Sequence, residues 1–174
     1  MKLHFGCGRE ILKEYVNIDF IQLPGIDLVV DLETTPYPFE DDSAEEIYGK
    51  HLFEHINNFL QLIEEIHRIL KPTGRLKIIA PYFAGHGAFN DPTHKRFFGW
   101  TTMDYFNENG YYSKAKYRIL RKRIFFFSSK KFMQSVWYSI PFDMLINAFP
   151  MIYQRFFCYW LPSSEIHYEL QPVK

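Results

Sequence analysis

Two glycines and two carboxylates near the amino terminus have the types and the spacing needed to hold a nucleoside. Gly6 and Gly8 follow a short apolar run, and Asp19 and Asp31 close the next two apolar runs. Glycines at the carboxyl end of a strand let ligand atoms approach the backbone, and carboxylates at neighbouring strand ends can accept hydrogen bonds from ribose hydroxyls or adenine edges. The pattern predicts a nucleoside site at one edge of a sheet.

The elements that must position these residues are short buried strands and one clear helix. Buried parallel strands read as nearly continuous apolar runs, and such runs occur at residues 3–5, 15–20, 27–30, 46–49 and 75–80. Between the last two, apolar residues recur at helical spacing over 59–70, with Asn57 or Asn58 as the cap. This order predicts a parallel crossover, and hence an α/β domain that binds ligands at the carboxyl ends of its strands.

The second half of the chain predicts a functional loop and two further strands. A loop rich in glycine, histidine and asparagine follows Pro81, and loops at this edge of a sheet usually carry function. A basic, strand-like run spans 114–127. The alternation of Ile166, Tyr168 and Leu170 predicts a final strand with one buried face.

Length, charge and cysteine content restrict the class of protein. The 174 residues suffice for one domain with its own core, and the 20 basic and 20 acidic residues balance, so no overall field recruits nucleic acid. Only Cys7 and Cys158 could pair, and no secretory leader precedes Leu3, which together predict a reducing, cytoplasmic location. No uninterrupted apolar stretch reaches the roughly 18 residues of a membrane-spanning helix.

A basic and aromatic segment, residues 114–160, departs from this balance. No acid occurs from Asn109 through Phe142, whereas the basic residues there are Lys114, Lys116, Arg118, Arg121, Lys122, Arg123, Lys130 and Lys131. Such a segment could contact an anionic membrane, bind a phosphorylated or lipid-linked acceptor, or stack bases. The plainer alternative is a solvated edge strand followed by helices whose aromatic face completes the core or a dimer contact.

Seven motifs occur in order along residues 3–106: Phe5-Gly6-Cys7-Gly8, Val16-Asn17-Ile18-Asp19, Asp27-Leu28-Val29-Val30-Asp31-Leu32, Pro36-Tyr37-Pro38-Phe39, His51-Leu52-Phe53-Glu54-His55, Leu70-Lys71-Pro72-Thr73-Gly74 and Asp91-Pro92-Thr93-His94. As an ordered set they resemble the class I S-adenosylmethionine-dependent methyltransferases, in the branch called methyltransferase type 11. The resemblance implies a Rossmann-like α/β fold with a mostly parallel seven-stranded sheet and an antiparallel last strand.

The resemblance also implies S-adenosylmethionine as the cofactor and assigns its contacts. The glycine turn would lie against the methionine part, the first aspartate would bind the ribose hydroxyls, the second aspartate with the following leucine would frame the adenine, and a Lys-His pair would border the sulfonium. The expected cofactor-binding residues are therefore Phe5, Gly6, Cys7, Gly8, Asp19, Asp31, Leu32, Lys50 and His51.

The chain departs from the family pattern in its first crossover. His4 stands where many relatives carry an acid that helps to hold the cofactor's amino group, and Glu10 replaces a third glycine. Only residues 9–16 separate Gly8 from Asn17, whereas a parallel crossover usually takes about a dozen residues or more. The first helix is therefore either about one turn long or replaced by irregular structure. The family's leading helices are also missing, which makes a homodimer a further expectation.

Methyl transfer from a sulfonium is an in-line displacement, so the enzyme mainly aligns the acceptor and excludes water. His94 is our candidate for a base that takes the acceptor's proton, with Asp91 orienting it or contacting the acceptor. The alternative is that Asp91 caps a turn and His94 closes the loop. Cys7 has no basic partner nearby and is expected to fill the turn rather than act as a nucleophile.

The segment from His51 to His55 also matches the H-x-x-E-H motif of inverted zinc proteases. In those enzymes two histidines on one helix face bind zinc and the glutamate serves as the base. We place this alternative below the methyltransferase because no third ligand is marked downstream, and we expect no metal. In the preferred interpretation Glu54 and His55 form the polar start of the helix.

The sequence thus predicts a single methyltransferase-like domain over 1–174, with a core of 1–124 and 164–174 and a helical, aromatic-rich insertion over 125–163. We expect a cytoplasmic enzyme that uses S-adenosylmethionine to methylate an unidentified small-molecule or glycan-type acceptor, with no specific nucleic-acid partner. The alternative is a methyltransferase-like binding or scaffold protein without catalysis, which His4 and the short crossover would explain.

Overall fold

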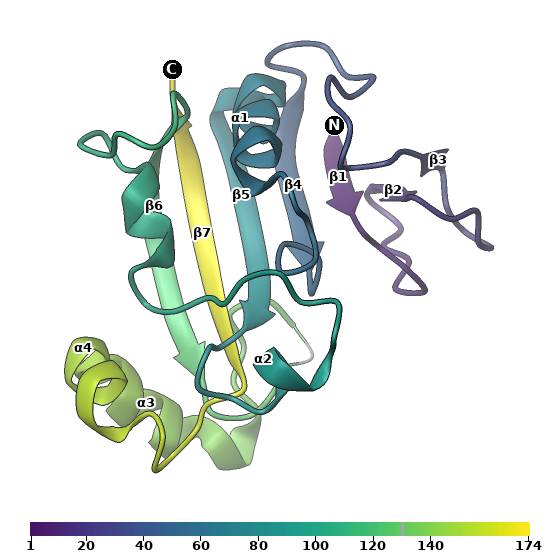
Figure 1. The fold of residues 1–174 in the computed structure, drawn as a ribbon. Coiled ribbons are helices and arrows are strands. Elements are labelled where there is room, and N and C mark those ends of the chain that lie inside the picture. The colour runs from purple at the N-terminus through teal and green to yellow at the C-terminus, as the bar shows by residue number, and fades with distance from the viewer. Residues whose placement is uncertain (130) are drawn as a thin grey trace.

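The computed structural model describes residues 1–129 and 131–174 and is built on one seven-stranded sheet of order β3-β2-β1-β4-β5-β7-β6 (Figure 1). The strands are β1 (Lys2–Phe5), β2 (Val16–Asp19), β3 (Leu28–Val29), β4 (Ala44–Lys50), β5 (Leu70–Pro81), β6 (Lys116–Phe125) and β7 (Glu165–Val173). β1 to β5 pair in parallel, whereas β7 lies between β5 and β6 and is antiparallel to both. This confirms the predicted Rossmann-like α/β fold.

One long helix and several short ones accompany the sheet. The α-helices are α1 (Phe59–Ile69), α2 (Gly87–Asn90), α3 (Ile140–Ala148) and α4 (Pro150–Ile152), with 3₁₀ turns at Thr102–Phe106 and Trp137–Ser139 and a π-helical turn at Tyr153–Phe157. α1 lies against one face of the sheet, and α3 and α4 lie at the end toward which β5 and β6 point (Figure 1). In the part of the chain that the structure describes, no helix is long and apolar enough to cross a membrane.

The hydrophobic core lies between α1 and the sheet. Its members include Leu3, Phe5, Ile47, Leu62, Ile63, Ile66, Leu76, Ile78, Tyr168 and Leu170. Because successive strand residues point to opposite faces, Tyr48 and His167 face away from α1. Phe132, from the segment between β6 and β7, contacts both, with ring centroids 6.4 Å from Tyr48 and 5.5 Å from His167. That segment therefore helps to cover the second face of the sheet.

The connection from β1 to β2 contains no helix, so the irregular alternative is correct. The buried Asn17 side chain orders it, because Oδ1 accepts from the Leu12 N–H at 2.9 Å and Nδ2 donates to the carbonyls of Leu12 at 3.1 Å and Tyr15 at 3.0 Å. Asp27 in turn accepts from the Asn17 backbone N–H at 2.7 Å. One buried amide thus satisfies backbone groups that a helix would otherwise pair.

The start of α1 also differs from the prediction. Asn58 occupies the N-cap position, but its side chain makes no capping hydrogen bond. Instead the Glu33 carboxylate accepts from the backbone N–H of Asn57 at 2.8 Å and of Asn58 at 3.2 Å. Asn58 thus takes the predicted N-cap position without a capping hydrogen bond from its side chain. A carboxylate distant in the sequence binds the two N–H groups that precede the helix and suits the positive end of the helix dipole.

The last strand is buried more completely than its sequence alternation indicated. β7 has hydrogen-bonded neighbours on both sides, and Glu165 and His167 are as buried as Ile166 and Tyr168. The prediction of one buried face is wrong, since the polar side chains of the other face lie beneath residues of the segment between β6 and β7. Met133 N–H, for example, donates to His167 Nδ1 at 3.0 Å.

Candidate active site

A cleft of about 520 Å³ opens at the carboxyl ends of β1, β2 and β3. It is lined by Gly6, Asp19, Phe20, Val30, Asp31, Leu32, Glu33, His51, Leu52, His55, Ile56 and Thr93. The structure therefore brings together Gly6, Asp19, Asp31, Leu32 and His51 from the expected cofactor-binding set. Open parallel sheets bind ligands at this edge, and small-molecule sites commonly measure roughly 300–1,000 Å³. We name this cleft the nucleoside cleft.

The other residues of the expected set do not line the nucleoside cleft. Phe5 is fully buried in the core, and Lys50 Nζ pairs with Glu10 Oε2 at 3.2 Å. Cys7 is 3% exposed, and burial, assisted by the nearby Asp19 charge, raises the pKa of its thiol to about 11. A protonated, enclosed thiol is a poor nucleophile, so the geometry favours the space-filling role.

The glycine turn has a backbone conformation that other residues rarely adopt. Gly6 has φ +61° and Gly8 has φ +52°, both in the left-handed region. A Cβ atom on Gly6 would lie 2.7 Å from Leu52 Cδ1, so this position has no room for a side chain. Gly8 N–H points at Asp19 and donates to Oδ2 at 2.8 Å, which ties the turn to the end of β2.

The Asp19 carboxylate is only 7% exposed and is held by backbone donors. Besides Gly8, its Oδ1 accepts from the N–H groups of Phe20 at 2.8 Å and Ile21 at 3.3 Å. An ionised carboxylate offers about four lone-pair sites, so one acceptor position is left for a ligand hydroxyl. Asp31, by contrast, is exposed at the mouth of the nucleoside cleft, where it accepts from Glu33 N–H at 3.0 Å.

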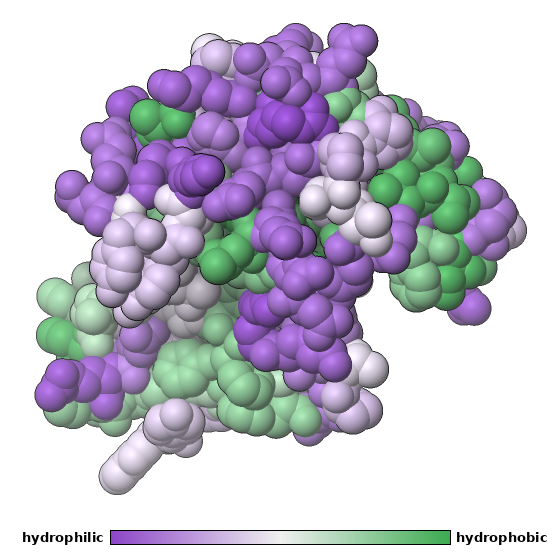
Figure 2. All heavy atoms as spheres, turned by 45° about the horizontal axis from the view of Figure 1, so that its top comes forward, coloured by the Kyte–Doolittle hydropathy of each residue, from purple (hydrophilic) through white to green (hydrophobic). Residues whose placement is uncertain are grey.

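Phe20 is a cleft residue that the sequence analysis missed. Its ring is 69% exposed although it lines the nucleoside cleft. Ile21 and Val29, from the same end of the molecule, are also exposed, and Figure 2 shows hydrophobic residues gathered at the edge where β2 and β3 lie. The available signal was an aromatic residue directly after the strand-terminal Asp19.

A second, polar cleft of about 280 Å³ adjoins the first, because His51 and His55 line both. The side chains around this polar cleft are His51, Glu54, His55, Pro81, His86, Asn90, Asp91, His94, Ser128 and Ser164, together with Gly87. It contains both members of the expected catalytic pair, His94 and Asp91. The residues come from the β4–α1 connection, the loop after β5 and the segment between β6 and β7.

Asp91 is coupled to His55 rather than to His94. Its carboxylate accepts from the Thr93 backbone N–H at 2.8 Å and hydroxyl at 2.6 Å, and Thr93 Oγ1 lies 2.8 Å from His55 Nδ1. His94 Nδ1 lies 2.9 Å from the carbonyl of Ala88, and its side chain is 6% exposed. In both His55 and His94 these contacts are made through Nδ1, and Nε2 takes no part in them.

The H-x-x-E-H segment forms turns and no helix, so the expected polar helix start at Glu54 and His55 is wrong. His51 has φ +51°, and its ring lies between two carboxylates, with Nδ1 3.4 Å from Glu54 Oε1 and Nε2 3.1 Å from Glu165 Oε1. Burial alone would lower the pKa of His51, but these carboxylates raise it to about 9. The two histidines of the motif do not share a helix face as the zinc-protease alternative requires.

Comparison with known proteins agrees with this arrangement. Residues 3–78 match a family model described as a methyltransferase domain, and comparison with curated proteins finds no match. Among solved structures, the chain is similar to a SAM-dependent methyltransferase from Archaeoglobus fulgidus (TM-score 0.64, 17% identity, 98% of this chain and 85% of that one). It is also similar to an S-adenosylmethionine-dependent methyltransferase from Mesorhizobium loti (TM-score 0.57, 13% identity, 98% and 89%).

A third similar structure is coclaurine N-methyltransferase bound to N-methylheliamine and SAH (TM-score 0.57, 11% identity, 98% of this chain and 65% of that one). At these identities the likenesses show the fold, and the family model adds a methyltransferase-domain match over residues 3–78. The chain thus has the fold of S-adenosylmethionine-dependent methyltransferases, and its residues 3–78 match the methyltransferase domain, in agreement with the resemblance of its motifs.

Proposed function

We propose that the protein methylates a small-molecule or glycan-type acceptor held in the polar cleft, with S-adenosylmethionine held in the nucleoside cleft. The observation that carries this proposal is the junction of the two clefts, since His51 and His55 line both. Ligands seated on either side of that junction would meet there, as an in-line transfer requires. The segment between β6 and β7 closes the polar cleft with Ser128 and Ser164.

The residues of the nucleoside cleft fit the cofactor. Asp19 keeps an acceptor position for a ribose hydroxyl, the exposed Phe20 ring suits contact with a purine, and Gly6 lines the cleft. When bound, S-adenosylmethionine supplies an electrophilic methyl group. The family's acid at position 4 is replaced by His4, which is buried and lies 3.3 Å from Asn17 Oδ1 through Nδ1, so this side chain does not reach the cleft.

In the polar cleft we propose that His94 is the base that takes the proton from the acceptor. A hydroxyl or amine seated there would find the free Nε2 atoms of His55 and His94, and a neutral imidazole takes up a proton near physiological pH. Asp91 would act one step away, by holding Thr93 and through it the ring of His55. His51, Leu32 and Asp31 would complete the cofactor contacts.

The proposal is tested by binding and by turnover. Calorimetry should show S-adenosylmethionine and its demethylated product binding to one site per chain, and a screen of metabolites and glycan precursors with methyl-labelled cofactor should reveal a labelled product that His94→Ala diminishes. No binding at millimolar ligand would contradict the cofactor site. Tight binding with no product across the screen would favour the scaffold alternative.

A second proposal concerns the insertion between β6 and β7, which we propose contacts an anionic membrane surface. The insertion exposes large apolar side chains, among them Trp137 at 81%, Tyr159 at 74% and Trp160 at 85%. Figure 2 shows hydrophobic residues gathered on the side where α3 and α4 lie. Arg155 and Lys131 lie in the same segment, whereas Lys130 of the predicted basic set is outside the described residues. Aromatic and basic side chains together suit the membrane interface.

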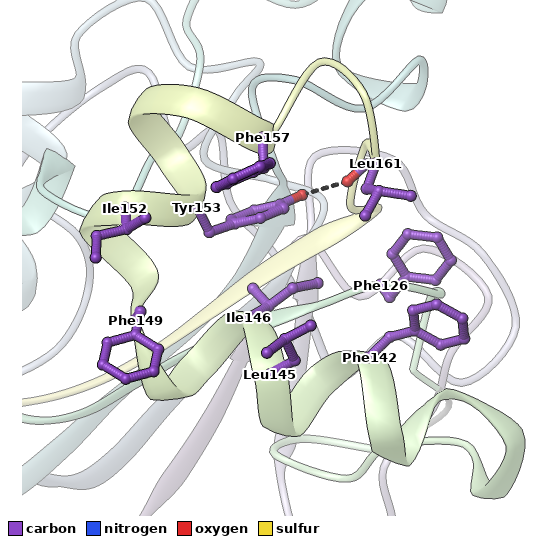
Figure 3. A pocket seen from close by; sticks show the side chains of 9 residues that line it. All are labelled: Phe126, Phe142, Leu145, Ile146, Phe149, Ile152, Tyr153, Phe157 and Leu161. Atoms are coloured by element: carbon purple, nitrogen blue, oxygen red, sulfur yellow. Dashed lines mark hydrogen bonds between the residues drawn. The ribbon is translucent and has the colours of Figure 1, made fainter.

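The insertion is anchored firmly enough to present this surface. The fully buried Asp143 accepts from Phe126 N–H at 2.8 Å, and Asn147 Oδ1 accepts from Ile124 N–H at 2.8 Å, so α3 is tied to the end of β6. The insertion also holds an open apolar groove of about 400 Å³ (Figure 3). Its lining residues are Phe126, Phe142, Leu145, Ile146, Phe149, Ile152, Tyr153, Phe157 and Leu161.

We expect the protein to sediment with vesicles that contain phosphatidylserine and to do so less in high salt, because the basic side chains are exposed. Replacing Trp137 and Trp160 together with alanine should abolish sedimentation, since both rings are mostly exposed on the insertion. Tyr111→Ala is the matched control, because that ring is equally exposed, at 81%, but lies outside the insertion. Equal sedimentation of the Trp variant and the wild type would refute the membrane contact.

A further inference from the structure

Glu54, His55 and His94 form a compact cluster where the two clefts meet. One ligand atom from each side chain lies within 4.8 Å of the others, and His94 Nε2 is 4.0 Å from Glu54 Oε1. The two imidazole rings meet edge to face with centroids 4.7 Å apart. All three side chains line the polar cleft, and His55 also lines the nucleoside cleft.

The Glu54 carboxylate lacks the partners that its burial demands. It is 1% exposed, and neither oxygen accepts a hydrogen bond from any described residue. His51 Nδ1 lies 3.4 Å from Oε1, which is a charge contact and leaves Oε2 unpartnered. A buried carboxylate is costly unless it is paired, hydrogen-bonded or coordinated to a metal. The unpartnered oxygen therefore points to a ligand in the polar cleft.

Hydrogen bonds fix both imidazoles in the tautomer that a metal requires. A carbonyl oxygen only accepts, so His94 Nδ1, 2.9 Å from Ala88 O, carries the proton. The Thr93 hydroxyl gives its single proton to Asp91 at 2.6 Å and hence accepts from His55 Nδ1 at 2.8 Å. In both neutral rings the lone pair is then on Nε2. Metal-binding histidines characteristically donate their other N–H to a carbonyl or a carboxylate relay in this way.

We propose that Glu54, His55 and His94 bind a divalent transition-metal cation of the zinc class. Two imidazoles and one carboxylate form a ligand set that such ions accept, with further positions open to water or substrate. Ligands about 2.1 Å from a tetrahedral ion lie about 3.4 Å apart, so the cluster would contract on binding. The two loops are already joined, since Lys95 N–H donates to the Glu54 carbonyl at 2.7 Å.

This site departs from the sequence expectation of no metal. The H-x-x-E-H motif directed attention to His51 and His55 as the histidine pair. In the structure His51 is occupied by Glu165, and the second imidazole comes from His94 in the loop after β5. The proposed third ligand thus lies in the Asp91-Pro92-Thr93-His94 segment, the same segment that the sequence predicts to carry a catalytic base.

The position of the ion gives it a role that rests on the proposed function. Its open coordination positions would face the polar cleft, next to the junction with the nucleoside cleft. A divalent cation orients a coordinated hydroxyl and lowers its pKa. With the ion bound, His94 would be a metal ligand that positions the acceptor, and the proton-accepting role that we propose for it would apply only to the metal-free protein. Metal binding itself does not depend on that role.

Zinc alone is the probe for the site. Protein stripped with a chelator and dialysed against ZnCl₂ should retain one zinc per chain by elemental analysis and should titrate as one site in calorimetry. Glu54→Gln and His94→Ala should each weaken binding by more than the roughly 10–100-fold that is typical of removing an outer hydrogen-bond partner. Thr93→Val, which removes such a partner from His55, should weaken binding within that range.

His86→Ala is the matched control, because His86 lines the same cleft but lies outside the cluster, and it should leave the zinc dissociation constant unchanged. Circular dichroism checks that each variant is folded, and Thr93→Val provides a test if a buried variant is not. Failure of the wild type to retain zinc, or equal losses in the His86 and His94 variants, would overturn the site. S-adenosylhomocysteine calorimetry, run separately without zinc, shows whether the proposed function fails instead.

Discussion

Replacing Asp19 with alanine should weaken the binding of S-adenosylhomocysteine by roughly one hundredfold. A hydrogen bond to a charged group contributes about 1.5–3 kcal/mol, which corresponds to tenfold to somewhat over one hundredfold in affinity. The upper end applies here because the carboxylate is 7% exposed and also holds Gly8 N–H at 2.8 Å and Phe20 N–H at 2.8 Å. Its removal would loosen the turn and the aromatic side of the nucleoside cleft as well as the ribose contact. Isothermal calorimetry measures the change.

Asp31→Asn is the comparison for this experiment. Asp31 lines the same cleft but is exposed, so water competes for its hydrogen bonds and the loss should be smaller than for Asp19→Ala. Thermal unfolding of both variants establishes that they are folded. A larger loss for Asp31→Asn than for Asp19→Ala, or an Asp19 variant that binds as tightly as the wild type, would contradict the proposal that Asp19 binds the ribose.

Replacing Glu165 with glutamine should destabilise the protein at pH 7 by about 3 kcal/mol, since breaking a buried charge pair commonly costs about 3–5 kcal/mol. Glu165 is 1% exposed and accepts from His51 Nε2 at 3.1 Å, Ser129 N–H at 2.9 Å and His167 Nε2 at 3.3 Å. It therefore joins β7 to the glycine-like turn at His51 and to the insertion. Urea unfolding measures the change, with Glu169→Gln as control, because that side chain on the same strand has, among the described residues, a single ion-pair contact, at 4.0 Å with Arg75.

The effect of Glu165→Gln should depend on pH. Burial alone would raise the pKa of Glu165, but hydrogen bonds from His167, His51 and Ser129 hold it well below its usual range. A carboxylate whose pKa falls on folding stabilises the protein fully above the unfolded pKa, about 4.3, and loses that contribution as the pH falls toward the folded pKa. The difference between wild type and variant should thus shrink from pH 7 to about pH 3. A difference that grows in acid would contradict the assignment.

Much of the fold could be predicted because it depends on local pattern. The apolar runs located the parallel strands, and the periodicity over 59–70 located α1 at Phe59–Ile69. The strand ends then placed Gly6, Asp19 and Asp31 at one cleft, because the carboxyl ends of parallel strands share one edge. These inferences need no knowledge of distant contacts.

The features that could not be predicted depend on contacts distant in the sequence. Glu33, from another loop, binds the backbone N–H groups just before α1, and the hydrogen bonds of Asn17 order a first crossover that has no helix. The burial of His167 depends on a segment that crosses the sheet face. The cluster around Glu54 depends on a loop forty residues downstream, which brings His94 next to the Glu54 carboxylate. The spacing of apolar residues and the composition of a segment do not indicate which distant residues it will contact. The oligomeric state, the domain boundaries and the roles of the site residues stay predictions.

The most direct test of the cofactor site is a crystal structure of the protein with S-adenosylhomocysteine. We expect density in the nucleoside cleft, with the ribose hydroxyls on the Asp19 carboxylate, the adenine between Phe20 and Leu32, and the sulfur directed toward His51. Ligand bound elsewhere, or a cleft closed by the protein's own side chains at saturating ligand, would contradict the account.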